Sequence, residues 1–252
     1  MEIAGQHILV TGAASGLGAA TARELASAGA AVTVLDRSAE AAERMAEELG
    51  GRAIAGDVTD PEIGAQIDGA IEALGPLRGL VNCAGIGTAA RIAGREGPMP
   101  LEDFERVIRV NLVGTFNMLR LAADRMTTLD PLPTGERGAV VNTASVAAQD
   151  GQIGQAAYAA SKGGIVSLAL PAARELARFG IRVNTVAPGI FRTPLLEELP
   201  EEVQRGIAAS IPFPQRLGEP EEFARTVRFC LENAYLNAEV IRLDGAVRLP
   251  PK

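Results

Sequence analysis

The sequence predicts an α/β fold: a doubly wound parallel sheet of seven strands with helices on both faces. Short apolar runs alternate with Ala-rich helical runs along all 252 residues. Strands separated by helices pair in parallel through right-handed crossovers, which gives the expected strand order 3-2-1-4-5-6-7. No repeat, linker or low-complexity stretch interrupts the alternation, so we expect residues 1–252 to form one domain.

The composition excludes several classes of function. The chain carries 24 basic and 31 acidic residues, a net charge of −7, which argues against nucleic acid or an anionic membrane as main partner. Cys83 and Cys230 lie in apolar runs and indicate reduced thiols, and the single His7 makes a zinc site unexpected. No apolar run reaches membrane-spanning length, and the first strand leaves no room for a targeting peptide, so we expect a cytoplasmic protein.

The N-terminal segment has the organisation of a phosphate-binding turn. An apolar run at His7–Val10 leads into T-G-A-A-S-G-L-G at Thr11–Gly18, and an Ala-rich helix follows. Gly12 permits the turn, Gly16 lets a backbone approach a pyrophosphate, and Gly18 lets helix and strand pack closely. The helix N-terminus would then offer free N–H groups to phosphate. The glycine spacing differs from G-x-G-x-x-G, and an ordinary glycine-rich loop is the alternative.

The second strand, Ala31–Leu35, ends in an acidic residue, Asp36. A carboxylate about 20 positions after such glycines can accept both hydroxyls of an adenosine ribose and would repel a 2′-phosphate. NAD is therefore favoured over NADP, although Arg37 could soften the preference. Further along, Asp57 and Val58 could meet the amino group and the face of an adenine, and Asp57 could equally be a helix cap.

The middle of the chain continues the alternation. We expect helices at Ser38–Leu49, Ile63–Leu74 and Leu101–Met126, and strands at Arg52–Ala55, Leu80–Asn82 and Ala139–Asn142. The small residues of N-C-A-G, at 82–85, suit a backbone that lies against a cofactor. The loop at Thr88–Pro100 follows a strand's carboxyl end, where substrates bind in open α/β sheets. Asn111 interrupts the apolar stripe of the long helix, where it could bond irregular backbone, hold a water or be a satisfied core amide.

The candidate catalytic chemistry lies between Ser145 and Lys162. Tyr158 and Lys162 are four residues apart in a helix expected over Gln155–Phe179, which places them on one face. A free tyrosine has a pKa of about 10 and is a poor base, whereas a neighbouring ammonium favours the phenolate. An ammonium together with a cationic cofactor ring could lower that pKa toward 7. Ser145, near a strand end, could hold a substrate oxygen. The alternative is a surface tyrosine and lysine on an amphipathic helix.

The last part of the chain completes the expected site. We expect strands at Ile181–Ala187 and Glu239–Leu243 and a helix at Glu219–Glu232. Pro188 begins a turn, Phe191 could cover a nicotinamide ring, and Thr193 could bond its amide. The acidic, Pro-rich stretch at about 191–214 suits a lid over a substrate.

Together these motifs resemble the short-chain dehydrogenase/reductase family, in the family's order and over nearly the whole chain. The matching pieces are T-G-A-A-S-G-L-G, Asp36, Asp57-Val58, N-C-A-G, Asn111, Ser145, Y-A-A-S-K and Pro188-Gly189. The stretches N-T-A-S-V-A-A-Q-D-G-Q-I-G-Q-A-A-Y-A-A-S-K-G-G, I-P-F-P-Q-R-L-G-E-P and L-N-A-E-V-I-R-L-D-G-A-V-R resemble family members that act on 3-hydroxyacyl-CoA. The resemblance implies a Rossmann-type NAD(P)-binding domain.

The resemblance also implies roles for individual residues. Tyr158 would be the catalytic acid/base, and Lys162 would lower its pKa and bind the nicotinamide ribose. Ser145 would hold the reacting oxygen, Asn111 would fix a water in a proton relay, and Gln155 would line the substrate pocket. The residues expected at the NAD site, from the patterns and the resemblance together, are Gly12, Ser15, Gly16, Leu17, Gly18, Asp36, Asp57, Val58, Cys83, Ala84, Gly85, Tyr158, Lys162, Pro188, Phe191 and Thr193.

The expected function is NAD-dependent interconversion of a secondary alcohol and a ketone, first of all 3-hydroxyacyl-CoA and 3-oxoacyl-CoA. Two alternatives stay open. One keeps the chemistry with another substrate, a hydroxysteroid or a 3-oxoacyl-acyl-carrier-protein, and the other is an NAD-binding scaffold without catalysis. The family resemblance further implies a homotetramer that pairs through the helices at Leu101–Met126 and Gln155–Phe179.

Overall fold

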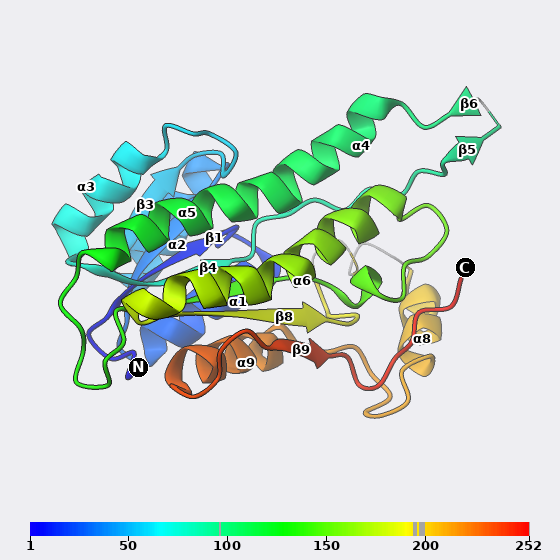
Figure 1. The fold of residues 1–252 in the computed structure, drawn as a ribbon. Helices are drawn as coiled ribbons and strands as arrows, with labels where there is room; N and C mark the ends of the chain where they lie inside the picture. The colour runs from blue at the N-terminus through cyan, green and yellow to red at the C-terminus, as the bar shows by residue number, and fades with distance from the viewer. Residues whose placement is uncertain (96, 194–195, 197–199, 252) are drawn as a thin grey trace.

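A seven-stranded parallel sheet forms the centre of the computed structural model, which describes residues 1–95, 97–193, 196 and 200–251 (Figure 1). Its order is β3-β2-β1-β4-β7-β8-β9, which is the expected order once the strands of this sheet are numbered along the chain. The strands are β1 (His7–Thr11), β2 (Ala31–Asp36), β3 (Arg52–Ala55), β4 (Leu77–Asn82), β7 (Gly138–Thr143), β8 (Ile181–Pro188) and β9 (Val240–Leu243). A separate antiparallel hairpin pairs β5 (Ala93–Gly94) with β6 (Gly97–Pro98).

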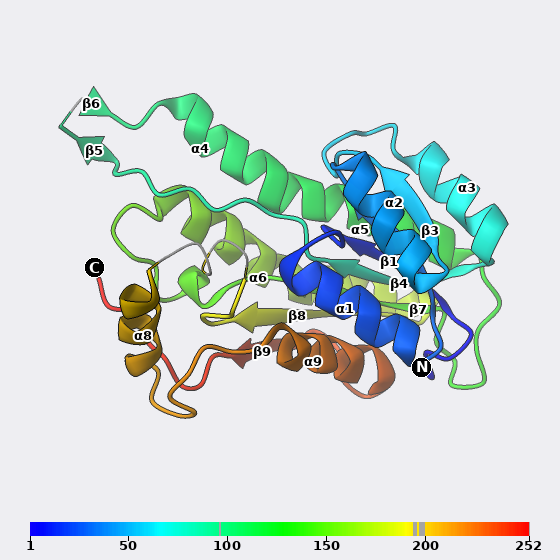
Figure 2. The same cartoon turned by 180° about the vertical axis from the view of Figure 1, so that it is seen from behind.

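Helices cover both faces of the sheet, as Figures 1 and 2 show from opposite sides. One face carries α1 (Gly16–Ser27), α2 (Ala39–Leu49) and α9 (Pro220–Glu232), and the other carries α3 (Gly64–Leu74), α4 (Leu101–Ile108), α5 (Gly114–Thr127) and α6 (Ala156–Leu176). Side chains of a strand alternate between faces. Accordingly Ile8 and Val10 of β1 lie in one core, and Leu9 lies in the other. Such strands, buried on both faces, explain the continuous apolar runs of the sequence.

The long helix expected at Leu101–Met126 is divided in the structure. It consists of α4, a five-residue π-helical turn at Arg109–Val113, and α5. A π-turn places an extra residue in the helix and is frequent at functional sites. Periodicity over the whole stretch does not reveal it, since α4 and α5 are both regular.

After β8, the chain at residues 190–192 pairs with Gly218, which lies just before α9. Phe191 forms a parallel bridge with Gly218, and the backbone N–H groups of Arg192 and Gly218 donate to the carbonyls of Gly218 and Ile190. Between the two paired segments lies α8 (Glu201–Ala209). The expected lid at about 191–214 falls partly on residues 194, 195 and 197–199, which lie outside the described part of the chain, so the lid stays a prediction. Among the described residues, no helix is long and apolar enough to cross a membrane.

Helix α9 anchors this region to the core through one apolar face. Phe223, Val227, Cys230 and Leu231 recur at helical spacing, and all four are fully buried. The ring of Phe223 meets that of Phe191 edge-on, with centroids 6.3 Å apart and an interplanar angle of 80°. Edge-to-face geometry of this kind is favourable between aromatic rings.

We expect Phe223→Ala to lower the free energy of unfolding by roughly 3–5 kcal/mol, because it leaves a cavity in the core. Phe229→Ala in the same helix is the matched control, since the Phe229 side chain is half exposed. Its loss should stay below about 1 kcal/mol. Urea denaturation of both variants measures the difference, and equal losses would contradict the described packing of α9.

Candidate active site

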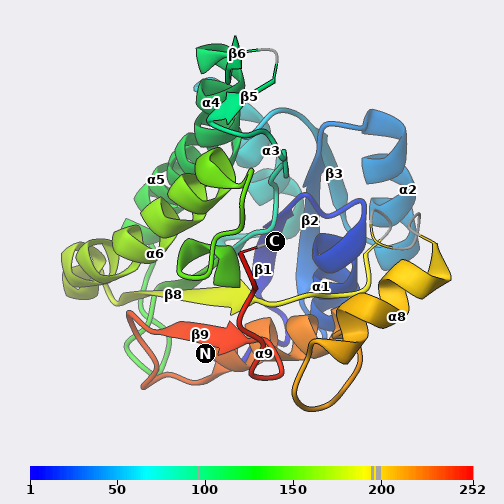
Figure 3. The ribbon, with the colours of Figure 1, turned by 90° about the vertical axis from the view of Figure 1, so that its right-hand side faces the viewer.

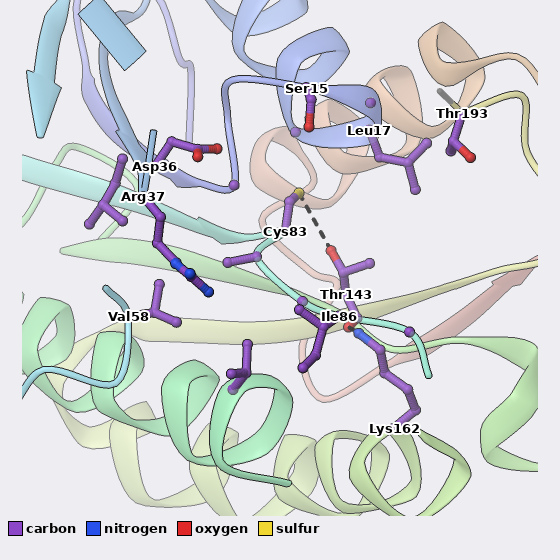
Figure 4. A pocket seen from close by; sticks show the side chains of 18 of the residues that line it. Ser15, Leu17, Asp36, Arg37, Val58, Cys83, Ile86, Thr143, Lys162 and Thr193 are labelled. Carbon is purple, nitrogen blue, oxygen red and sulfur yellow. Dashed lines mark hydrogen bonds between the residues drawn. The ribbon is translucent and has the colours of Figure 1, made fainter. Parts of the chain in front are cut away.

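A cavity of about 630 Å³ opens at the carboxyl ends of the central strands (Figure 4). It lies where the strand order reverses between β1 and β4, the position at which open α/β sheets bind ligands. All but one of the residues expected at the NAD site line it: Gly12, Ser15, Gly16, Leu17, Gly18, Asp36, Asp57, Val58, Cys83, Ala84, Gly85, Tyr158, Lys162, Pro188 and Thr193. The exception is Phe191.

The glycine turn and the start of α1 form one wall of the cavity. Gly12 has a positive φ of 62°, and a Cβ at this position would lie 2.8 Å from Ala84 Cα. A Cβ on Gly18 would lie 2.1 Å from the Gly12 carbonyl oxygen, so helix and strand can approach this closely only with glycine. Ser15 precedes α1 without a side-chain capping bond, and the first turn holds no acidic residue. The free N–H groups and positive dipole end therefore fit a pyrophosphate.

A fixed carboxylate lies beside this glycine turn. Asp36 accepts hydrogen bonds from the backbone N–H groups of Ala14, at 3.2 Å, and Ser38, at 3.1 Å. A carboxylate has about four acceptor positions, so it can still accept ribose hydroxyls. Arg37 lies beside it, with its Nε 4.0 Å from the Asp57 carboxylate.

Asp57 closes a local turn and lines the cavity, whereas the helix that follows, α3, is preceded by Ile63 at its N-cap, so Asp57 is not a helix cap. Its Oδ1 accepts from the backbone N–H of Thr59 at 2.8 Å. Val58 beside it is buried and lines the same wall. Figure 4 shows Asp36, Arg37 and Val58 on one side of the cavity and Lys162 and Thr193 well away from them.

Two threonines at strand ends, which the sequence patterns did not single out, organise the floor of the cavity. The hydroxyl oxygen of Thr11 accepts from the backbone N–H groups of Cys83 and Ala84, both at 3.1 Å, and so fixes the N-C-A-G backbone. The Thr143 hydroxyl donates to Cys83 Sγ at 3.5 Å. Burial raises the pKa of the Cys83 thiol to about 11, so this wall stays uncharged. Their place as last residues of β1 and β7 is the signal that could have identified both threonines.

Tyr158 and Lys162 lie one turn apart on α6 and both line the cavity, as expected. Lys162 is 5% exposed, and its Nζ donates to the Thr143 carbonyl at 2.8 Å and lies 5.7 Å from the centroid of the Tyr158 ring. Burial lowers the pKa of Lys162 to about 8. The pair is therefore an interior arrangement, which excludes the alternative of two surface side chains on an amphipathic helix.

The pKa of Tyr158 in the protein alone lies above its ordinary value. Burial raises it, and a hydrogen bond with Ser145 lowers it only in part. Without a cofactor, loss of hydration thus disfavours the phenolate more strongly than its neighbours favour it. The expected lowering of this pKa by Lys162 together with a cationic cofactor ring stays a prediction. Ser145 is buried, and its Oγ also accepts from the Ala147 backbone N–H at 3.1 Å.

Asn111 lies in the π-helical turn and is fully buried. Its side-chain amide accepts from the Ile86 backbone N–H at 2.8 Å and donates to the Ile86 carbonyl at 3.0 Å and to Ser161 Oγ at 3.0 Å. Ser161 Oγ in turn donates to the Tyr158 carbonyl at 2.7 Å. Asn111 therefore both bonds irregular backbone and has satisfied donors, and it links the loop after β4 to the helix that carries Tyr158.

Phe191 does not cover the cavity, which corrects the expected role of its ring. The side chain is 7% exposed and packs into the core against Phe223. A Cβ on Gly218 would lie 2.7 Å from the Phe191 ring, so the ring occupies the space that this glycine leaves. Burial of an aromatic ring is more favourable than exposure at an open cavity. Thr193, two residues further on, does line the cavity.

Gln155 also lies outside this cavity. It precedes α6, and its Oε1 accepts from the Gln152 backbone N–H at 3.1 Å. It lines a neighbouring pocket of about 380 Å³ that also includes Arg91, Ile92 and Ala93 of the loop after β4.

Comparisons with known proteins agree with this architecture. The family model for short chain dehydrogenases matches residues 6–204. The 3-hydroxyacyl-CoA dehydrogenase type-2 of Rattus norvegicus is 49% identical over 255 residues, which cover 99% of this chain and 98% of the relative.

Solved structures of dehydrogenases also share this fold. The 3-hydroxyacyl-CoA dehydrogenase type-2 from Mycobacterium avium has a TM-score of 0.93 at 46% identity, covering 98% of this chain and 97% of that one. A 7α-hydroxysteroid dehydrogenase complexed with NADH and 7-oxo glycochenodeoxycholic acid has a TM-score of 0.88 at 30% identity, covering 100% and 97%. The family model and these relatives agree with the glycine turn and the paired Tyr158 and Lys162, and the chain belongs to the short-chain dehydrogenase family.

Proposed function

We propose that this protein is an NAD-dependent dehydrogenase that interconverts 3-hydroxyacyl-CoA and 3-oxoacyl-CoA. The observation that carries the proposal is the meeting of Tyr158, Lys162 and Ser145 beside a cavity shaped for a dinucleotide. The substrate class is supported by the names of relatives that are 46–49% identical over nearly the whole chain. The family is one of oxidoreductases.

In this proposal each part of the cavity holds one part of NAD. The N-terminus of α1 binds the pyrophosphate, Asp36 the adenosine ribose, and Asp57 with Val58 the adenine. Lys162 binds the nicotinamide ribose, and Thr193 bonds the nicotinamide amide. Bound NAD supplies the hydride acceptor, and the protein supplies orientation and the movement of the proton.

The side chains on α6 and β7 account for the proton. During oxidation Tyr158 Oη accepts the proton of the substrate hydroxyl while Ser145 Oγ holds the reacting oxygen, and during reduction Tyr158 returns it. Lys162, with its pKa near 8, carries a positive charge at neutral pH and favours the phenolate. Asn111 holds the surrounding backbone and fixes a water that relays the proton from Lys162 toward solvent.

Assembly and location belong to the proposal as well. Val113, Phe116 and Leu170 are apolar side chains on the long helices and are 44–47% exposed in the single chain. Exposed apolar side chains on these helices favour the expected homotetramer, in which the helices of two copies would cover one another. We further infer a cytoplasmic protein with a small-molecule substrate.

The substrate is tested by following NADH oxidation with acetoacetyl-CoA, free acetoacetate and a ketosteroid. We expect rapid turnover of the CoA ester and slow turnover of the other two. Turnover of the ketosteroid without the ester would favour the hydroxysteroid alternative, to which the 30% identical solved structure draws attention. NADH binding without turnover of any ketone would favour the scaffold.

Tyr158→Phe should lower kcat by about 10²–10⁴-fold, because it removes the group that transfers the proton. NADH affinity, measured by fluorescence titration, should change little, since the ring stays in place. Tyr235→Phe is the matched control: Tyr235 is the second of the two tyrosines and is fully exposed. Normal turnover by Tyr158→Phe would refute the assignment.

The two directions of the reaction should respond differently to pH. Burial raises the pKa of Tyr158, so the phenolate that oxidation needs is scarce at neutral pH and its population grows as pH rises. We expect log(kcat/KM) for oxidation of 3-hydroxybutyryl-CoA to rise between pH 6 and 8 with a slope approaching about 1. Reduction of acetoacetyl-CoA needs the protonated form and should not rise. A flat oxidation profile over this range would contradict the role of the phenolate.

Cofactor choice should depend on Asp36. The wild-type protein should prefer NADH to NADPH, because the carboxylate accepts ribose hydroxyls and repels a 2′-phosphate. Asp36→Asn should raise the ratio of kcat/KM for NADPH over NADH by about tenfold, or about 1.4 kcal/mol. Glu40→Gln on α2, an exposed carboxylate, is the control. A wild-type preference for NADPH would overturn the NAD assignment.

A further inference from the structure

The segment Gln149–Gln155 joins the two halves of the candidate active site. It follows the 3₁₀ turn after Ser145 and ends where α6 begins, two residues before Tyr158. Its own bonds are short-range: the Gln149 and Asp150 N–H groups donate to the Val146 carbonyl, and that of Gln155 donates to the carbonyl of Gln152. No strand or helix of its own fixes this segment, so its position depends on contacts from elsewhere in the fold.

Arg242, on the edge strand β9, supplies the first of these contacts. Its Nη2 donates to Asp150 Oδ2 at 2.6 Å and its Nη1 to Gln149 Oε1 at 2.5 Å. Its Nε donates to Asp244 Oδ2 at 2.9 Å, so the guanidinium is held from both sides. The side chains of Arg242 and Asp150 are only 20% and 18% exposed. A planar guanidinium that is bonded in this way fixes the direction of its partners as well as their distance.

The chain beyond β9 makes a second attachment to the same segment, and Arg242 Nη2 donates to the Val247 carbonyl of this tail at 3.3 Å. Val247 is fully buried and anchors the tail in an apolar cluster with Ile211 and Leu217. From there the Pro250 carbonyl accepts from Gln152 Nε2 at 3.0 Å, and the Pro251 carbonyl accepts from the Ile153 N–H at 3.0 Å. Figure 3 shows the red C-terminal segment ending beside the green segment that leads into α6.

We propose that Arg242 is a positioning residue for the reaction: by holding Gln149 and Asp150 it sets where Ser145 and the substrate lie relative to Tyr158. The proposal rests on the proposed function. Arg242 does not line the cavity, and its side-chain hydrogen bonds go to Asp244, Gln149, Asp150 and Val247, none of which lines it. Its effect therefore passes through the Gln149–Gln155 segment and reaches the substrate side only.

The arrangement separates substrate binding from cofactor binding. The walls expected to hold the adenosine and the pyrophosphate come from the turns after β1, β2 and β3, none of which bonds to Arg242. On the nicotinamide side, Lys162 is held by the Thr143 carbonyl and not by Arg242. Loss of the guanidinium should thus weaken the apparent affinity for the carbonyl substrate and leave the affinity for NADH almost unchanged. A merely structural contribution would weaken both.

The first experiment needs no substrate. Hydrogen exchange is compared between the wild-type protein, Arg242→Met and Arg248→Met. Arg248 also pairs with Asp244, at 3.1 Å, yet bonds no residue of the Gln149–Gln155 segment, which makes it the matched control. We expect the amides of Gln152, Ile153 and Gln155 to exchange at least about tenfold faster in Arg242→Met alone. Equal exchange in the two variants would overturn the proposal.

The second experiment measures kinetics with NADH and acetoacetyl-CoA. Arg242→Met should raise KM for the ester by about tenfold with a smaller change in kcat, and should keep the Kd for NADH within about twofold. Asp150→Asn should have a similar effect, and the double variant should lose less than the sum of the two. Parallel loss of NADH affinity, or an unchanged KM, would overturn the positioning role.

Failures of the two proposals are distinguishable. A wild-type protein that does not turn over acetoacetyl-CoA contradicts the proposed function, whereas the exchange experiment still decides whether Arg242 holds the segment. If Arg242→Met does not fold, Arg242→Lys and Asp150→Asn carry both measurements. Lysine keeps the positive charge but lacks the planar guanidinium. The KM of Arg242→Lys should therefore lie between those of the wild-type protein and Asp150→Asn.

Discussion

The arrangement of the candidate active site depends on one buried ammonium. Lys162 Nζ has almost no access to water, and the Thr143 carbonyl 2.8 Å away is its hydrogen-bond partner. A buried charge without such a partner is strongly unfavourable. Because β7 is paired on both sides, by β4 and β8, this carbonyl is fixed relative to the whole sheet. The ammonium therefore ties α6, and with it Tyr158, to the sheet's carboxyl edge.

A second polar connection supports the first from the side of α4 and α5. The π-helical turn turns the Asn111 amide toward Ile86 and Ser161, so one side chain joins the loop after β4 to α6. A regular helix would present its side chains with a period that has no place for this inward amide. The π-helical turn and the polar Asn111 in the apolar stripe of the helix thus belong together, and both lie beside the candidate active site.

Much of this could be predicted from residue patterns. Strand positions and their order followed from buried apolar runs and crossover rules, and the cavity wall followed from glycines, Asp36 and the tyrosine–lysine spacing. What could not be predicted depends on three-dimensional competition. The Phe191 ring lies in the core because Gly218 leaves room for it, and the pKa of Tyr158 is set by burial that no local spacing reveals. Lys162 bonds the backbone carbonyl of Thr143, and because every residue has this group, the residue type gives no signal of the contact.

The bridge between Phe191 and Gly218 has a consequence for how the length of the chain between them can change over evolution. Since the two ends of the intervening stretch are tied together, its length alters the entropy of closure only logarithmically. Insertions or deletions between these ends would leave β8 and α9 in register with the rest of the fold. The length of the chain between these ends can in this sense change without rebuilding the strands and helices that hold Tyr158 and Lys162.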